Sequence, residues 1–137
     1  MTAFAATPLL VIMLIVYNAV VFLGSPATLD TGLLSLDLMS GARWTLTVSD
    51  ALIMLGLVLL YVEIFKSTRT SVGAVINHTL SMLVFVLFLV EFIVVDVAGT
   101  STFLILTLMS LIDVVAGFTV TIVAARRDFS VGEAPPL

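Results

Sequence analysis

The sequence lacks cysteine and is poor in charge, and each absence excludes a class of protein. Without cysteine, the chain has no disulfide, no thiol nucleophile and no cysteine-ligated metal. Only 10% of its 137 residues are charged, whereas a soluble domain has about 25%. With 61% hydrophobic residues and a mean hydropathy of +1.32, a soluble fold of this length would leave too much apolar surface in water. The solvent of this protein is therefore lipid.

Residues suited to catalysis or to cofactor binding are also scarce. His78 is the sole histidine, which excludes a two-histidine haem site within one chain and favours a residue at the membrane interface over a metal ligand. The sequence has no glycine-rich phosphate loop, no HExxH motif and no serine–histidine pair in a plausible site. Its basic residues are too few for a nucleic-acid surface. We therefore predict no enzyme activity, no catalytic residue, no metal and no cofactor.

Long apolar runs are what the sequence has, and four of them predict transmembrane helices. The single membrane domain, residues 1–137, has predicted spans at about 3–24, 50–66, 75–97 and 102–125, an external loop at 25–49 and a cytoplasmic tail at 126–137. From Pro8 to Gly24 the first run reaches only about 24 Å, against a hydrocarbon core of about 30 Å. We therefore expect the first helix to begin nearer Ala3. The predicted fold class is an all-α, antiparallel four-helix membrane bundle.

The external loop has a pattern of its own. Apolar and polar residues alternate on both sides of Ser40-Gly41, first around Leu36 and then around Trp44. Period-two alternation around a glycine turn indicates a short β-hairpin on the membrane face, and an irregular interfacial loop is the alternative. In either case Trp44 is expected to anchor the loop at the level of the lipid head groups.

Basic residues set the expected orientation. Lys66 and Arg69 flank the loop between the second and third spans, Arg126 and Arg127 follow the fourth span, and only Arg43 lies on the other side. Cytoplasmic loops carry an excess of lysine and arginine. We therefore predict that both termini are cytoplasmic and that the four clustered basic residues anchor the spans at the interface.

Three short stretches, VEIFKSTRT, INHTLSMLVF and AARRDF, resemble pieces of a family of short four-span bacterial inner-membrane proteins that has no assigned activity. The resemblance covers about residues 44 to 129. It implies the same four-span topology and a bacterial inner-membrane location, and it brings no catalytic residues.

Two acids inside the predicted spans are the sharpest functional signal. Glu91 lies about 9 Å from the outer end of the third span, and Asn18 lies at the same depth in the first span, where its amide could donate to the Glu91 carboxyl. Asp113 lies about 16 Å deep in the fourth span, and Tyr61 of the second span comes at a similar level.

The neighbours of Asp113 indicate close helix packing. Ser110 lies one turn before it and Gly117 one turn after it, so that the fourth span has a face of small residues. Without a counter-charge at this depth, we expect Glu91 and Asp113 to be largely protonated hydrogen-bond donors.

Two functions fit these acids. Intramembrane acids are a functional hypothesis by default, which here means a proton- or cation-conducting homo-oligomer that uses Glu91 and Asp113. Alternatively, neutral acids tie helices together. The sequence has neither a broken helix nor a polar pathway to both faces, which favours the second function. We therefore predict a non-enzymatic accessory or scaffolding subunit of a larger inner-membrane assembly, or a self-associating bundle. Its partners would be membrane lipids and other membrane subunits or copies of itself.

Overall fold

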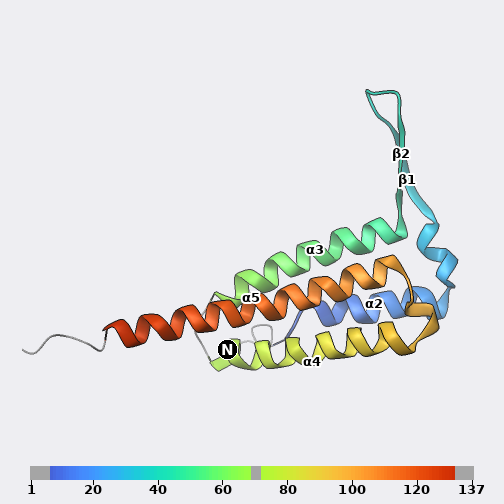
Figure 1. Cartoon of the computed structure of the whole chain (residues 1–137). Helices are drawn as coiled ribbons and strands as arrows, with labels where there is room; N and C mark the ends of the chain where they lie inside the picture. The colour runs from blue at the N-terminus through green and yellow to red at the C-terminus, as the bar shows by residue number, and fades with distance from the viewer. Residues whose placement is uncertain (1–6, 69–71, 132–137) are drawn as a thin grey trace, which may run out of the picture.

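Four α-helices lie side by side in the computed structural model, which describes residues 7–68 and 72–131, with side chains described for 7–68 and 75–123 (Figure 1). They are α2 (Leu10–Leu23), α3 (Val48–Ser67), α4 (Val72–Val94) and α5 (Ser101–Val131). Three of them are long and apolar enough to cross a membrane, over Val48–Ser67, Val75–Val94 and Ser101–Val123. The prediction of a helical membrane protein is thus confirmed, whereas a fourth crossing by α2 stays a prediction.

Helix α2 is the short one, with 14 residues that extend about 21 Å. The expected start near Ala3 lies outside the described residues. Helix α2 itself begins at Leu10 and its N-cap residue is Leu9, so Pro8 precedes it. Proline at position 8 restricts the residue before it to extended conformations, which explains why the backbone around Pro8 is not helical.

The ends of the last two helices also differ from the prediction. Helix α4 ends at Val94, and a short 3-10 turn, η2 (Asp96–Ala98), follows it. Helix α5 continues to Val131, six residues beyond the expected end at residue 125, so the backbone of Arg126 and Arg127 is helical and does not begin a tail. The side chains of these two arginines, and all of Arg69, lie outside the described residues, so their anchoring role stays a prediction.

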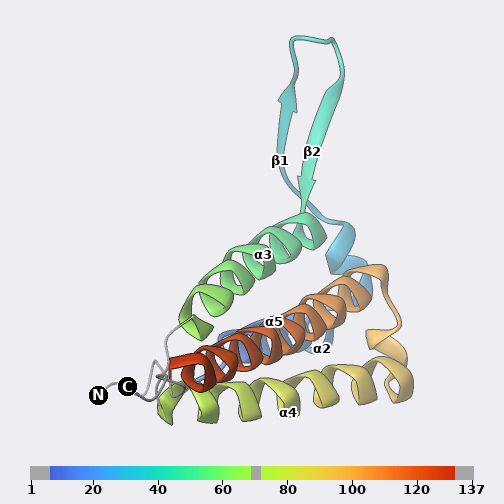
Figure 2. The ribbon, with the colours of Figure 1, turned by 60° about the vertical axis from the view of Figure 1, so that its left-hand side comes forward.

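The loop between α2 and α3 contains the hairpin that the alternation predicted. A 3-10 turn, η1 (Pro26–Asp30), leads into β1 (Gly32–Asp37), which pairs antiparallel with β2 (Arg43–Thr47). The turn is closed by the Gly41 N–H, which donates to the Leu38 carbonyl at 2.9 Å, and Gly41 has a φ of +83°. Glycine adopts that left-handed conformation without strain, which explains its place in the turn. The hairpin projects away from the helices beyond the start of α3 (Figures 1 and 2).

Each helix buries one narrow stripe. Helix α3 buries Leu52, Gly56, Leu60 and Glu63, and α4 buries Asn77, Ser81, Val84 and Phe88. At the end of the bundle near η2, the rings of Tyr17, Phe88 and Phe103 stack with centroids 4.7 and 5.3 Å apart. Glu63, Asn77, Ser81 and Asp113 are buried toward the other end, whereas Thr102 and Thr107 are buried polar residues of α5 outside this group.

Candidate functional site

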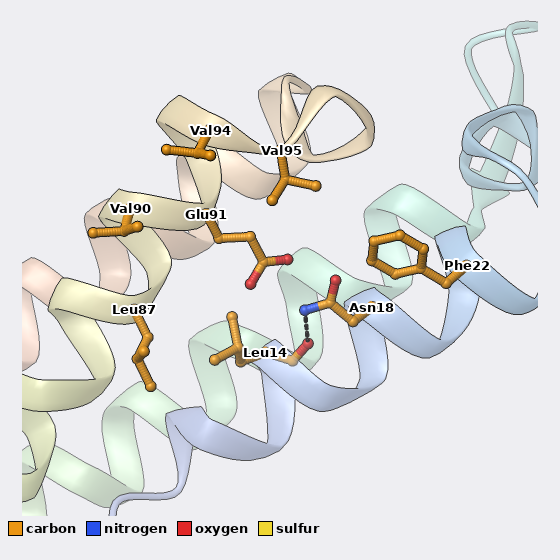
Figure 3. Close-up of a pocket in the computed structure, with 8 residues that line it drawn as sticks. All are labelled: Leu14, Asn18, Phe22, Leu87, Val90, Glu91, Val94 and Val95. Atoms are coloured by element: carbon orange, nitrogen blue, oxygen red, sulfur yellow. Dashed lines mark hydrogen bonds between the residues drawn. The ribbon is translucent and has the colours of Figure 1, made fainter.

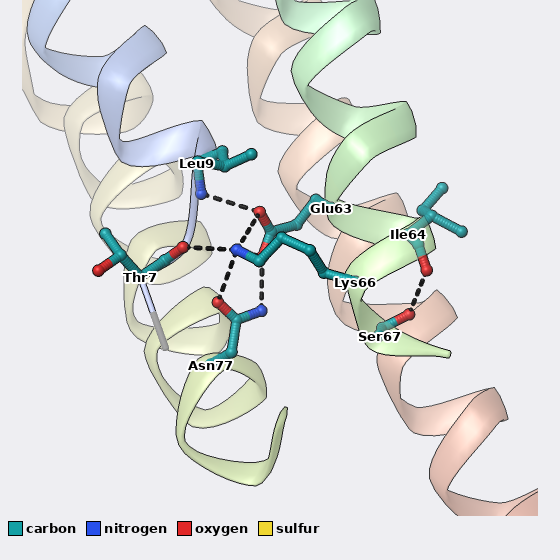
Figure 4. A network of polar contacts seen from close by, with 7 residues as sticks. All are labelled: Thr7, Leu9, Glu63, Ile64, Lys66, Ser67 and Asn77. Carbon is teal, nitrogen blue, oxygen red and sulfur yellow. Dashed lines mark hydrogen bonds and ion pairs between the residues drawn. The ribbon is translucent and has the colours of Figure 1, made fainter. Parts of the chain in front are cut away.

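The most completely buried acid is Glu63 of α3, whose side chain is 0% exposed (Figure 4). Its carboxylate accepts hydrogen bonds from the backbone N–H of Leu9 at 2.9 Å and from Asn77 Nδ2 at 2.5 Å. Lys66 Nζ lies 3.2 Å from the same carboxylate. Glu63 therefore joins α3 to the start of α2 and to α4.

Lys66 completes this network and does not reach outward. Its ammonium donates to the Thr7 carbonyl at 2.7 Å and to Asn77 Oδ1 at 3.3 Å, and its side chain is only 12% exposed. Glu63 and Lys66 are one helical turn apart on α3 and form an ion pair. The predicted role of Lys66 as an interface anchor stays a prediction.

Asp113 lies next to this network. Its side chain is buried on α5, where it interacts with the Ser81 hydroxyl of α4, although that contact does not have the geometry of a regular hydrogen bond. Glu63 and Lys66 are both within electrostatic range of the Asp113 carboxyl. Lys66 is thus a basic residue within electrostatic range of Asp113, contrary to expectation, but its ammonium is bound by Glu63, Asn77 and the Thr7 carbonyl.

The other residues expected around Asp113 divide into two groups. Ser110 is buried beside it and donates to the Thr107 carbonyl of its own helix at 2.7 Å. Gly117 lies directly under the His78 ring of α4, where a Cβ atom would overlap that ring, in agreement with its predicted packing role. Tyr61, in contrast, is 71% exposed on the outward face of α3, so the structure does not bring it to Asp113.

His78 lies within α4, inside the predicted third span and next to the buried Asn77. Its ring packs edge-on against Phe118 of α5 at a centroid distance of 4.4 Å. Its Nε2 atom is buried and has no hydrogen-bond partner among the described residues. The ring therefore fills space between α4 and α5.

The second polar site is a groove of about 470 Å³ between α2 and α4 (Figure 3). Glu91 points into it from α4 and Asn18 from α2, among aliphatic side chains. The predicted hydrogen bond between these two residues is wrong. Asn18 Nδ2 instead donates to the Leu14 carbonyl of its own helix at 3.0 Å, and Glu91 Oε1 and Asn18 Oδ1 have no partner in the described part of the chain.

The described residues contain no group of three or more acids and histidines that could hold a metal ion. Comparison of the chain with protein-family models, with curated proteins and with solved structures finds no match. The resemblance to short four-span inner-membrane proteins thus stays a prediction, and the function has to be argued from the residues themselves.

Proposed function

We propose that this protein is a non-enzymatic accessory or scaffolding subunit of a larger inner-membrane assembly, with self-association as the simplest form of that assembly. The observation that supports the proposal is the hairpin, which extends from the bundle and has one apolar face that no other described part of the chain covers.

The two faces of the hairpin differ sharply. On one face, cross-strand pairs join Leu34 to Leu46 and Leu36 to Trp44. On the other face, Ser35 hydrogen bonds with Thr45 at 2.9 Å and Asp37 pairs with Arg43 at 2.9 Å. An isolated two-stranded hairpin is marginally stable in water and needs a further contact on its apolar face. A partner subunit supplies that contact.

The interior of the bundle argues against catalysis or conduction within one chain. Its polar end contains Glu63 and Asp113, which tie helices together. The half nearer the hairpin is closed by Phe88, Phe103 and Leu106, all of them completely buried. An ion entering at the polar end would have to pass these bulky apolar side chains, which cannot replace its hydration.

The second candidate is a proton- or cation-conducting homo-oligomer. It is favoured by the Asp113–Ser81 contact and by the groove at Glu91, which put ionisable groups at two depths. Because the bulky apolar side chains separate these two sites within one chain, conduction would have to run between copies.

The location and orientation belong to the same proposal. Both termini lie in the cytoplasm of a bacterial inner membrane, α2 crosses as the fourth span with the residues that precede it, and the hairpin faces outward. The sequence positions of Lys66, Arg69, Arg126 and Arg127, beside the second, third and fourth spans, support this orientation.

The hairpin provides a direct test, because Trp44 is the only tryptophan and its fluorescence reports this element alone. The protein is extracted in a mild detergent and its native mass is measured with Leu36→Lys and with Ser35→Lys, which put the same charge on the apolar and on the polar face. We expect Leu36→Lys to dissociate the assembly and to shift Trp44 emission to longer wavelength, with Ser35→Lys leaving both unchanged.

Two results would contradict the subunit role. One is a wild-type protein of monomeric mass at every protein concentration. The other is strong quenching of Trp44 by brominated lipids together with an assembly that Leu36→Lys leaves intact, which would mean that the apolar face lies on lipid.

A further inference from the structure

The groove between α2 and α4 has the size and the lining of a ligand site. Its volume of about 470 Å³ falls within the range of small-molecule sites, about 300–1,000 Å³. Such sites combine apolar walls with a few converging polar groups. Here the polar groups are the Glu91 carboxyl and the Asn18 amide oxygen, and both have a buried oxygen without a partner among the described residues (Figure 3).

Glu91 differs from three other acids of the chain, whose carboxylates have partners. Asp37 is paired with Arg43, Asp50 accepts from the backbone and side chain of Thr47, and Glu63 has three donors. In its ionised form the Glu91 carboxylate accepts hydrogen bonds, as Asn18 Oδ1 does. A ligand that satisfies both must therefore donate at least two hydrogen bonds, and a positive charge on it would compensate the carboxylate. A primary ammonium group has three N–H donors and one positive charge.

The position of the groove indicates which class of molecule supplies the ammonium group. Glu91 lies three residues, about 4.5 Å, before the end of α4, and Asn18 lies five residues, about 7.5 Å, before the end of α2. The polar pair is thus near the end of the bundle, which we expect to lie close to the head-group layer. The groove is apolar on both sides of this pair, with Leu14, Leu87 and Val90 on one side and Phe22, Val94 and Val95 on the other. A ligand with a charged group and a hydrocarbon chain fits such walls better than a small soluble amine does.

We propose that the groove binds a membrane phospholipid through its primary ammonium head group, as in phosphatidylethanolamine. The ammonium donates to the Glu91 carboxylate and to Asn18 Oδ1, and the upper part of an acyl chain lies against the aliphatic wall. This site is independent of the assembly role, since it involves neither the hairpin nor Trp44.

The test compares lipids that share acyl chains and differ in head group. Purified protein in mild detergent receives phosphatidylethanolamine, phosphatidylcholine or phosphatidylglycerol, and bound lipid is counted by native mass spectrometry. We expect phosphatidylethanolamine to bind about tenfold tighter than either of the others, because phosphatidylcholine has no N–H donor and phosphatidylglycerol no positive charge. Dodecylamine is the probe for a soluble amine.

Variants assign the preference to the groove. Glu91→Gln should abolish it, and Val90→Trp, which fills the groove and keeps the acid, should abolish it as well. Tyr61→Phe, on the exposed face of α3, is the matched control and should keep it. An unchanged elution volume and helical content establish that each variant is folded.

Four results would overturn the proposal. They are equal binding of the three lipids, a preference that survives Glu91→Gln, and binding of dodecylamine that phosphatidylethanolamine does not displace. The fourth is a dimer that Glu91→Gln dissociates, because the groove would then hold a second copy of the chain. Loss of the assembly on Leu36→Lys with lipid preference intact would separate the two proposals.

Discussion

Lys66 and Arg43 each form an ion pair, and replacing each by methionine compares a buried pair with an exposed one in the same protein. The Arg43–Asp37 pair is the shorter, at 2.9 Å, but its side chains are 73% and 72% exposed. The Lys66–Glu63 pair is longer, at 3.2 Å, and its side chains are 12% and 0% exposed. If burial determines how much an ion pair contributes to stability, the Lys66–Glu63 pair contributes more although it is longer.

The expected loss in the free energy of unfolding depends on the groups that each substitution leaves without a partner. Lys66→Met removes contacts to three partners, Thr7, Glu63 and Asn77. At about 0.6 kcal/mol for each polar contact inside a membrane, this loss is about 2 kcal/mol. The Glu63 carboxylate then stays buried without a counter-charge, and breaking a buried pair in this way costs about 3–5 kcal/mol in soluble proteins. We expect a cost of about 2–5 kcal/mol, against less than about 1 kcal/mol for Arg43→Met.

The measurement is the free energy of unfolding in mixed micelles as the denaturing detergent is increased, followed by circular dichroism. The double variant Glu63→Gln/Lys66→Met should regain most of the stability that Lys66→Met loses, because it removes the uncompensated charge. A cost below 1 kcal/mol for Lys66→Met, or an equal cost for Arg43→Met, would refute the reasoning that burial controls these pairs.

Two further predictions concern topology and conduction. Reporter fusions after residue 70 and at the C-terminus should both report cytoplasm and a fusion at Gly41 the outside, and a C-terminus outside would exclude four spans. In proteoliposomes, wild type and Asp113→Asn should have the same oligomer size and no proton flux above that of empty vesicles. Wild-type flux that Asp113→Asn loses at unchanged size would replace the subunit role by the conducting oligomer.

Elements with strong local signals could be predicted from the sequence. The alternation around Ser40-Gly41 predicts the hairpin because side chains of a strand point to opposite faces, and the structure has Gly41 in the turn conformation that glycine favours. Ser49 and Asp50 indicated a helix start, and Asp50 does accept from the Thr47 N–H in the first turn of α3. Glu63 and Lys66 are one helical turn apart, so their pairing also follows from local spacing.

The faces of the helices could not be predicted. A helix that is apolar all round has no amphipathic pattern to show which side is buried. Leu57 of α3 is exposed and Leu60 is buried, although they are the same residue type. Counting residues along the helices places Tyr61 at the level of Asp113. The count does not show that Tyr61 lies on the outward face of α3. For the same reason, the sequence could not show that Asn77 and the Leu9 N–H meet Glu63, because neither is close to it in the chain.

Hydrogen bonding within a helix also escaped prediction. The depths of Asn18 and Glu91 agree well enough for both to line one groove, yet the Asn18 amide donates to Leu14, four residues earlier. A carbonyl of the same helix is always within reach, whereas a partner on another helix must be brought close by packing. Side-chain partners across helices are therefore predicted poorly by depth alone.

Glu63, Asp113 and Glu91 differ in how the charge of an ionised carboxylate would be compensated. This difference distinguishes a structural role from a functional one. An ionised carboxylate inside a membrane costs about 2.5–3.5 kcal/mol unless other groups offset it. Three donors surround Glu63 and close it off, and Asp113 has Ser81 beside it and Lys66 within range. Glu91 has neither a hydrogen-bond donor nor an ion-pair partner among the described residues, and it faces a groove of about 470 Å³. The free-energy cost of an ionised Glu91 is thus offset only by a group from outside the chain. Glu91 is neither the deepest nor the most buried of the three acids, but it is the one suited to binding a ligand.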